Sequence, residues 1–414
     1  VYDLSGSKKP VKRLWISSLE DSAILDGMQH LRSAEEYRHL AEAAVCRSQA
    51  DWLVGMNATR AYTTKYFKKL TVGRVQTPTL AMLVERAGQI SNFQKEKYFN
   101  VELDCDGIPA VKSKIFDPDE AEQLRSRCQG SEAIVTAVKE TEKKVKAPKL
   151  YDLTTLQREA NRIYGMTAKQ TLDTAQSLYE KKLITYPRTD SQYLTEDMEQ
   201  TARNVVRQIY EKYQLTGPFD QPEQPDVKKV MNNSKVTDHH AIIPTMELAS
   251  SHLDELKSWE EKILFLIAVH TVMAMSKDHI YQETEIEVEC QGEVFKTKGK
   301  TVLQDGWKIF ENCFKNKDRM AIVDPDQEMK ERMPKVTQGQ TFYAVAAEKT
   351  EHFTSPPKPY SEDTLLAAME TAGNKEFDED TEKKGLGTPA TRAGIIEKLI
   401  YSQYATRKGK QIIP

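Results

Sequence analysis

The sequence of 414 residues lacks the features of several common protein classes. The longest apolar run, Ile263 to Val269, is too short to cross a bilayer, so no membrane partner is expected. The start of the chain is neither basic nor apolar, and no signal peptide is expected. No two cysteines form a Cys-x-x-Cys pair, which argues against a zinc ribbon and a disulfide framework. The cysteines are Cys46, Cys105, Cys128, Cys290 and Cys313. A reduced, cytoplasmic protein fits these absences.

A nucleotide-binding P-loop is also missing. The tripeptide Gly299-Lys-Thr301 has Val294 where the upstream glycine of that motif would stand. Any reaction of this protein is therefore expected to proceed without ATP.

Acidic residues are absent from residue 57 to residue 83, although the whole chain has a formal net charge of −3. The basic residues of this stretch are Arg60, Lys65, Lys68, Lys69 and Arg74. A solvated helix face usually mixes charges of both signs. A one-sided positive charge favours a surface that faces phosphate groups.

The segment from Leu183 to Ser191 contains the residues best suited to chemistry. Pro187 favours an extended conformation at Tyr186, and residues two apart in an extended chain point to the same side. Tyr186 and Arg188 are therefore predicted to face one target. A phenol is a weak nucleophile, and a guanidinium can bind a phosphate and stabilise its growing charge. A surface turn with a core tyrosine is the alternative.

The chain alternates between helical and strand-rich parts. Capping boxes are predicted at Ser33, Thr154 and Thr167, and Thr77-Pro78 is predicted to start a helix that ends at Gly88. We expect an α+β protein with nested domains. Their predicted bounds are 1–90 with 351–414 for a helical domain, 91–150 with 284–350 for a β-rich domain, and 151–283 for the domain carrying Tyr186.

A faint repeat relates residues 167–184 to residues 388–405 at an offset of 221 positions. Each copy has an upstream helix, and a basic hairpin follows the second copy. This order predicts two winged-helix modules that dock on nucleic acid. Tyr186 falls opposite Arg407, so only the first copy could use a tyrosine nucleophile.

Four motifs in order along the chain resemble those of type IA DNA topoisomerases. The amino-acid sequences of these motifs resemble those of the topoisomerase III branch. They are Gly73-Arg-Val-Gln-Thr-Pro-Thr79, the segment around Tyr186, Asp238-His-His-Ala-Ile-Ile-Pro-Thr245 and Gly385-Leu-Gly-Thr-Pro-Ala-Thr-Arg-Ala393. The resemblance covers essentially the whole chain. It implies a mainly helical open ring with a hole for DNA, and a covalent bond between a tyrosine and a 5′ phosphate.

The resemblance also assigns roles to individual residues. Tyr186, Arg188 and His239 would be catalytic, with His239 as a phosphate-side donor or proton shuttle. The residues assigned to DNA binding are Arg60, Arg74, Gln76, His240, Thr391 and Arg392. Adjacent histidines in a strand point to opposite faces, so His239 and His240 are a poor chelate for one metal. No metal ligand is expected in this chain.

Type IA enzymes use magnesium held by acidic residues of a Toprim domain, and those acids are not found here. The pairs Asp104/Asp106 and Asp378/Asp380 are superficially similar, but they are expected to be solvated surface residues. We therefore interpret the chain as the core of such an enzyme without its Toprim domain, with no metal bound. Single-stranded DNA, with duplex DNA in the ring, is the expected partner of a monomer.

Other classes of DNA-binding protein fit the sequence less well than this interpretation. A non-catalytic scaffold that binds single-stranded DNA through winged helices is the main alternative. A tyrosine recombinase or type IB topoisomerase would need a His-x-x-Arg motif, which the sequence lacks. A rolling-circle relaxase would need His-x-His, and the pair His239-His240 has no spacer.

Overall fold

The computed structural model describes residues 5–16, 21–215, 225–236, 238–311, 335–374 and 385–414. The chain divides into two compact units. Unit 1 comprises Val1–Gly88, Pro148–Met275 and Pro359–Pro414, and unit 2 comprises Gln89–Ala147 and Ser276–Lys358. Extensive helices and strands confirm the mixed α and β class. The division into three domains stays a prediction.

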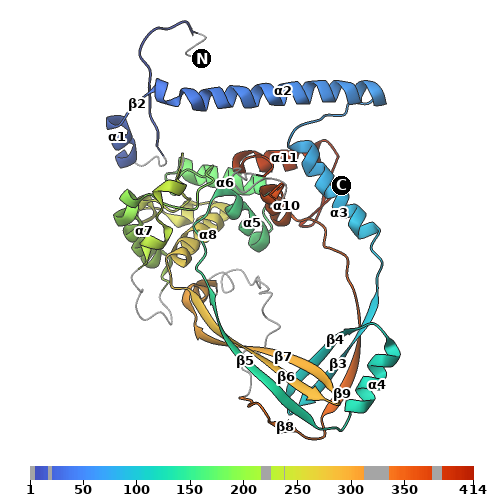
Figure 1. Ribbon diagram of the computed structural model, residues 1–414. Helices are drawn as coiled ribbons and strands as arrows, with labels where there is room; N and C mark the ends of the chain where they lie inside the picture. The colour runs from blue at the N-terminus through green and yellow to red at the C-terminus, as the bar shows by residue number, and fades with distance from the viewer. Residues whose placement is uncertain (1–4, 17–20, 216–224, 237, 312–334, 375–384) are drawn as a thin grey trace. The chain divides into compact units, whose positions relative to one another are not determined.

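Unit 2 is built on a seven-stranded antiparallel sheet in the order β8-β5-β6-β7-β4-β3-β9 (Figure 1). Its strands are β3 (Lys97–Cys105), β4 (Ile108–Ile115), β5 (Ala133–Val145), β6 (His279–Cys290), β7 (Glu293–Gln304), β8 (Thr341–Phe342) and β9 (Ala346–Phe353). Segments far apart in the sequence are neighbours in this sheet, since Lys97 in β3 pairs with Phe353 in β9. Alternate residues of β3 are buried, as its sequence pattern predicts.

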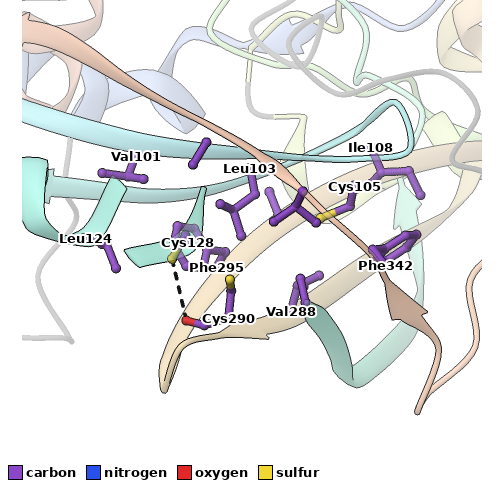
Figure 2. Packing of buried hydrophobic residues seen from close by; sticks show 14 of the residues in the cluster. Val101, Leu103, Cys105, Ile108, Leu124, Cys128, Val288, Cys290, Phe295 and Phe342 are labelled. Atoms are coloured by element: carbon purple, nitrogen blue, oxygen red, sulfur yellow. Dashed lines mark hydrogen bonds between the residues drawn. The ribbon is translucent and has the colours of Figure 1, made fainter. Parts of the chain in front are cut away.

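One face of the sheet and helix α4 (Pro118–Cys128) enclose the core of unit 2 (Figure 2). The side chains of Val101, Leu103 and Phe295 are fully buried there. Cys105 and Cys128 belong to the same core, and burial raises the pKa of their thiols to about 11 and about 12. These thiols are therefore protonated packing groups at neutral pH.

Unit 1 is mainly helical. Its helices are α1 (Asp21–Gln29), α2 (Arg38–Tyr66), α3 (Gln76–Ser91), α5 (Leu153–Tyr164), α6 (Ala168–Glu180), α7 (Glu199–Tyr213), α8 (Ser258–Ala274), α10 (Glu362–Thr371) and α11 (Pro389–Tyr401). Short strand pairs are β1 (Lys12–Arg13) with β2 (Arg32–Ser33), and β10 (Thr406–Lys408) with β11 (Gln411–Ile413). Short 3₁₀ helices include η2 (Ala34–Tyr37) and η3 (Glu196–Met198). Within the described residues, no helix combines the length and apolar character needed to cross a membrane.

The repeat in the sequence is present in the structure. Helices α6 and α11 begin and end at positions 221 apart, and Thr167 and Thr388 are their N-caps. Both helices end in the same turn, with left-handed Lys182 (φ 61°) and Gln403 (φ 58°). Each helix is thus a matching element of two similar halves of unit 1.

Two predicted helix starts are wrong by a few residues. Helix α5 is capped by Asp152, which forms the capping box with Thr155, so the predicted cap Thr154 lies inside the helix. Only Thr154 has a Glu or Gln three residues later, but Asp152 is also a favoured N-cap residue and occupies the extended N-cap conformation. Helix α3 starts at Gln76 and continues to Ser91, past the predicted end at Gly88.

The capping box predicted at Ser33 begins η2, and the long helix α2 follows η2 directly. The apolar residues along α2 predict a buried face, yet none of its residues is buried. Trp52, for example, is 64% exposed. The sequence pattern therefore gives the helix correctly but not its burial.

Candidate active site around Tyr186

Tyr186 lies in an extended segment that follows α6. The N–H of Thr185 donates to the carbonyl of Ile243 (3.0 Å), and the hydroxyl of Thr189 donates to the carbonyl of His239 (2.9 Å). These bonds hold the segment antiparallel to the one containing His239. The predicted strand from Leu183 is reduced here to an isolated bridge. Its hydrogen bonds nevertheless fix Tyr186 opposite His239.

The ring of Tyr186 contacts the imidazole of His239, with 4.3 Å between ring centroids. Tyr179 of α6 packs edge-on against Tyr186, at 5.4 Å. Along the segment Pro187 is buried, whereas Tyr186 is half-buried and Arg188 is exposed. This alternation is the one expected of an extended chain. The contact places the imidazole of His239 against the aromatic ring of Tyr186.

The two adjacent histidines have different surroundings. His240 is buried, and its Nδ1 lies 2.8 Å from the carbonyl of Ala241. His239 is half-buried, and burial lowers the pKa of its imidazole although Asp238 and Asp190 oppose the shift. A lowered pKa keeps His239 neutral at pH 7, which is the form that can accept a proton.

A pocket of about 160 Å³ lies beside this pair. Three parts of unit 1 line it: Arg188, Thr189 and Asp190 from the tyrosine segment, Asp238 and His239 from the facing segment, and Thr388, Pro389 and Ala390 from the start of α11. The structure thus brings Arg188 and His239 together, as the resemblance implies, and adds the N-terminus of α11 to them. Free N–H groups at a helix start attract anions such as phosphate.

Two glycines shape the loop that delivers α11 to the pocket. Gly385 (φ +64°) packs so closely that an added Cβ would lie 2.3 Å from the carbonyl oxygen of Glu370. Gly387 (φ +69°) also adopts the left-handed conformation that side chains disfavour. The glycines of the Gly-Leu-Gly-Thr-Pro motif therefore have a backbone role.

The two predicted DNA-binding residues of α11 take part in internal hydrogen bonds. The hydroxyl of Thr391 completes the capping box with Thr388. Arg392 is only 2% exposed, and it donates to the carbonyl of Leu386 (3.0 Å) and the hydroxyl of Thr154 in α5 (2.9 Å). Burial lowers the pKa of this guanidinium. Arg392 therefore positions α11 against α5, and its contact with DNA stays a prediction.

The predicted DNA-binding residues of α2 and α3 differ in exposure. Arg60 is exposed on α2. Arg74 is also exposed in part, and its Nε lies 2.6 Å from Oδ1 of Asp51. Gln76 is buried, and within the described residues its side-chain carbonyl has no hydrogen-bond partner. The roles of these residues in DNA binding stay predictions.

The described residues contain no group of three or more His, Cys, Asp or Glu side chains that could hold a metal ion. Asp104 and Asp106 are exposed surface residues at the turn between β3 and β4, as predicted. Asp378 and Asp380 lie outside the described residues.

Sequence reasoning missed Trp15, Asp190 and Asp238. The indole N–H of Trp15 donates to the carbonyl of Asp238 at 2.6 Å, across 223 positions of sequence. Asp190 and Asp238 belong to motifs that the sequence does show, so their place in the pocket could have been inferred. No local pattern marks Trp15.

Comparisons with known proteins give the family of this chain. Residues 35–414 match the family described as DNA topoisomerase. DNA topoisomerase 3 of Bacillus subtilis is 40% identical, over 100% of this chain and 58% of that protein. DNA topoisomerase 3 of Shouchella clausii is 37% identical, over 97% of this chain and 56% of that protein.

Full-length topoisomerase I of Thermotoga maritima has a similar fold, with a TM-score of 0.74 and 24% identity over 97% of this chain and 63% of that one. The chain spans 58% of the length of the first of these relatives. The family match covers most of the chain, and the chain belongs to the DNA topoisomerase family as a type IA, topoisomerase III-like member.

Proposed function

We propose that this chain is the core of an enzyme that cuts one DNA strand, passes another strand through the break and reseals the first. The observation that carries the proposal is the contact between Tyr186 and His239, 4.3 Å between ring centroids, beside a pocket lined by Arg188. This arrangement supplies a nucleophile, a proton acceptor and a phosphate-binding cation. In cleavage of a phosphodiester these groups would attack the phosphorus, take up the proton and stabilise the growing charge.

The proposed reaction begins when the phenol oxygen of Tyr186 attacks a backbone phosphorus. A Tyr–O–P bond forms at the 5′ phosphate and the bond from phosphorus to the 3′ oxygen breaks. The leaving 3′ oxygen takes a proton from water and becomes a 3′ hydroxyl. His239 accepts the phenol proton, since its lowered pKa keeps the imidazole neutral. Religation is the reverse reaction. The bond between Tyr186 and the phosphate conserves the energy of the cleaved phosphodiester bond, so no nucleotide is needed.

Arg188 has a separate role in this proposal. Its guanidinium is exposed and lines the pocket, where it can bind two phosphate oxygens at once. Charge on those oxygens grows in the transition state, and a fixed cation stabilises that charge most. The start of α11 would add the N–H of Ala390 on the other side of the pocket, since Pro389 has no N–H and the N–H of Thr391 donates to the carbonyl of Thr388.

Magnesium is proposed to act outside this chain, as the family resemblance implies. The family resemblance assigns it to acidic residues of a Toprim domain, and no step proposed here depends on a metal held by this chain.

The resemblance also supports the larger arrangement. We propose that the two helix pairs, α5 with α6 and α10 with α11, are winged-helix modules of an open ring around DNA. Single-stranded DNA would bind Arg60, Arg74 and the start of α11, and duplex DNA would occupy the ring. A monomer acting in the cytoplasm is proposed.

The substitution Tyr186→Phe tests the nucleophile. In a protein that joins this chain to a Toprim domain, it should abolish DNA cleavage and leave binding of single-stranded DNA nearly intact. Phenylalanine keeps the ring in contact with His239 but lacks the attacking oxygen. Gels of labelled DNA under denaturing conditions detect the protein-linked strand.

Tyr179→Phe is the matched control, since Tyr179 packs against Tyr186 and should keep cleavage. Protein-linked DNA formed by Tyr186→Phe would refute the proposed nucleophile. Binding without cleavage by the unsubstituted protein would instead support the alternative of a non-catalytic single-strand-binding scaffold.

A further inference from the structure

Trp15 contacts the proposed proton acceptor directly. Its indole stacks on the imidazole of His239, with 5.8 Å between centroids and 14° between the ring planes. Its N–H also donates to the carbonyl of Asp238, the residue just before His239. One side chain therefore holds both the ring of His239 and the backbone that carries it.

Trp15 is itself fixed by the N-terminal segment. It stacks on Tyr37 at 5.3 Å, and the guanidinium of Arg13 lies 5.2 Å from the centre of the Tyr37 ring. The pairing of β1 with β2 aligns Arg13 with Arg32 and so holds the strand before Trp15 in place. Trp15 thus belongs to a stack of Tyr37, Trp15, His239 and Tyr186.

A second link joins the same segment to the tyrosine loop, but it is weak. The ammonium of Lys182 lies 2.7 Å from Oδ1 of Asp21. Asp21 is 84% exposed at its side chain, and exposed ion pairs are largely screened by water and salt. The contact of Trp15 is therefore the specific one.

We propose that Trp15 is a positioning residue of the tyrosine site, which keeps the imidazole of His239 against the ring of Tyr186. This inference rests on the proposed function of His239 as proton acceptor. Trp15 acts through His239 and is not itself a catalytic residue.

The contact with Trp15 helps to bury the imidazole of His239, and burial affects the pKa of that imidazole. Asp238 and Asp190 favour the protonated imidazole of His239. Arg188 lines the same pocket, and burial lowers the pKa of the neighbouring His240. Burial outweighs the two carboxylates and lowers the pKa. On the N-terminal segment, the charged group that contacts the stack is Arg13, which lies against the ring of Tyr37.

The first test measures His239 in the chain itself, without DNA. Histidine labelled with ¹³C allows the imidazole signals to be followed against pH by NMR, with His239→Asn to assign its signal. Trp15→Ala should move the midpoint upward, toward the ordinary value of about 6.5. Trp15→Phe, which keeps an aromatic cover but lacks the N–H, should move it less.

Trp52→Ala is the control, because Trp52 is an exposed tryptophan on α2 and should leave the midpoint unchanged. An unchanged midpoint in Trp15→Ala, with a folded far-UV circular dichroism spectrum, would overturn the inference. If Trp15→Ala does not fold, the titration midpoint of His239 in Trp15→Phe becomes the test. A midpoint equal to that of the unsubstituted chain would then overturn the inference.

The second test measures cleavage against pH in a protein that includes a Toprim domain. Trp15→Ala should slow cleavage roughly ten- to a hundredfold, because a small misplacement of a reacting group is costly. The acid limb of the pH profile of cleavage should also move to higher pH in Trp15→Ala. The profile of Trp15→Phe should lie between those of Trp15→Ala and the unsubstituted protein.

The two proposals fail in different ways. A profile that keeps its position in Trp15→Ala would count against Trp15 alone. Cleavage that survives Tyr186→Phe would count against the proposed function, whatever the NMR midpoints show.

Discussion

Arg188 is the exposed cation nearest in sequence to the proposed nucleophile, and its planar side chain matters as much as its charge. A guanidinium offers two parallel N–H groups to two phosphate oxygens, whereas an ammonium is a point charge. Its place in the pocket beside His239 allows such a two-point contact.

Arg188→Lys should therefore slow cleavage more than a conservative change suggests. Loss of one such contact costs about 2–4 kcal/mol in the transition state. Single-turnover cleavage of a labelled oligonucleotide measures the rate, and Lys235→Arg, a change of the same kind outside the pocket, is the control. An unchanged rate in Arg188→Lys would rule out direct contact with the phosphate.

Asp152 is a buried carboxylate that caps α5. Its Oδ1 accepts from the N–H of Thr155 at 2.7 Å, and Arg392 and Glu370 are the nearby charges. Burial raises the pKa of Asp152 to about 6, well above its ordinary value of 3.8. The folded chain therefore binds a proton more tightly here than the unfolded chain does, so ionisation of Asp152 costs stability as the pH rises from about 4 to 6.

Asp152→Asn should remove this cost and keep the cap, since asparagine is an equally good N-cap. Relative to the unsubstituted chain, its free energy of unfolding should rise with pH between about 4 and 6, by about 2–3 kcal/mol, and level off above. Urea unfolding at several pH values measures the difference. The exposed N-cap Asp117 of α4 is the control, since Asp117→Asn removes no buried charge; a difference that does not vary with pH at Asp152 would contradict the prediction.

At the scale of elements, Glu362 joins the two similar halves of unit 1. One carboxylate oxygen of this residue accepts from the N–H of Ala168 at the start of α6 (2.5 Å), and the other accepts from Nε of Arg407 in β10 (2.8 Å). Its side chain is 3% exposed. Arg407 has a second partner, Glu397, which is 35% exposed at its side chain.

Glu362→Ala should lower the free energy of unfolding by about 2–4 kcal/mol, because it leaves a buried donor and a half-buried cation with fewer partners. Glu397→Ala removes the other partner of Arg407 and should cost less than about 1 kcal/mol, as exposed pairs do. Urea unfolding followed by circular dichroism compares the two variants. Equal losses would show that Glu362 does not join the halves.

Local patterns predict elements well where one residue decides the local geometry. The capping box at Thr167 and the equal lengths of α6 and α11 follow from the sequence, and so does the alternation in β3. The cap of α5 does not, because Thr154 matches the capping-box pattern with Gln157, whereas the true cap Asp152 pairs with Thr155, which the pattern does not include. The burial of Arg392 and the stack on Trp15 depend on partners far away in the chain, which no local pattern encodes.

At the scale of the whole molecule, the charge of this chain is unevenly placed. The formal net charge is −3, yet the stretch 57–83 has basic residues and no acidic one. Arg60 lies exposed on α2 within that stretch. A strand of DNA bound there would release counterions from its phosphates, so its affinity should fall as salt rises.

The chain should therefore bind single-stranded DNA in a salt-dependent way but should not relax supercoiled DNA, with or without magnesium. A fluorescence titration with a labelled oligonucleotide at several salt concentrations measures the binding, and a gel assay measures the relaxation.

Arg60→Gln should reduce the slope of log affinity against log salt by about 0.7, the share of one phosphate contact on a single strand. Lys139→Gln in β5 makes the same change of charge outside the acid-free stretch and should leave the slope unchanged. An affinity that does not change with salt would contradict the prediction that the stretch 57–83 faces phosphate groups. Relaxation by this chain alone would place the acids needed for magnesium within it, and Asp104, Asp106, Asp378 and Asp380 would be the first to substitute.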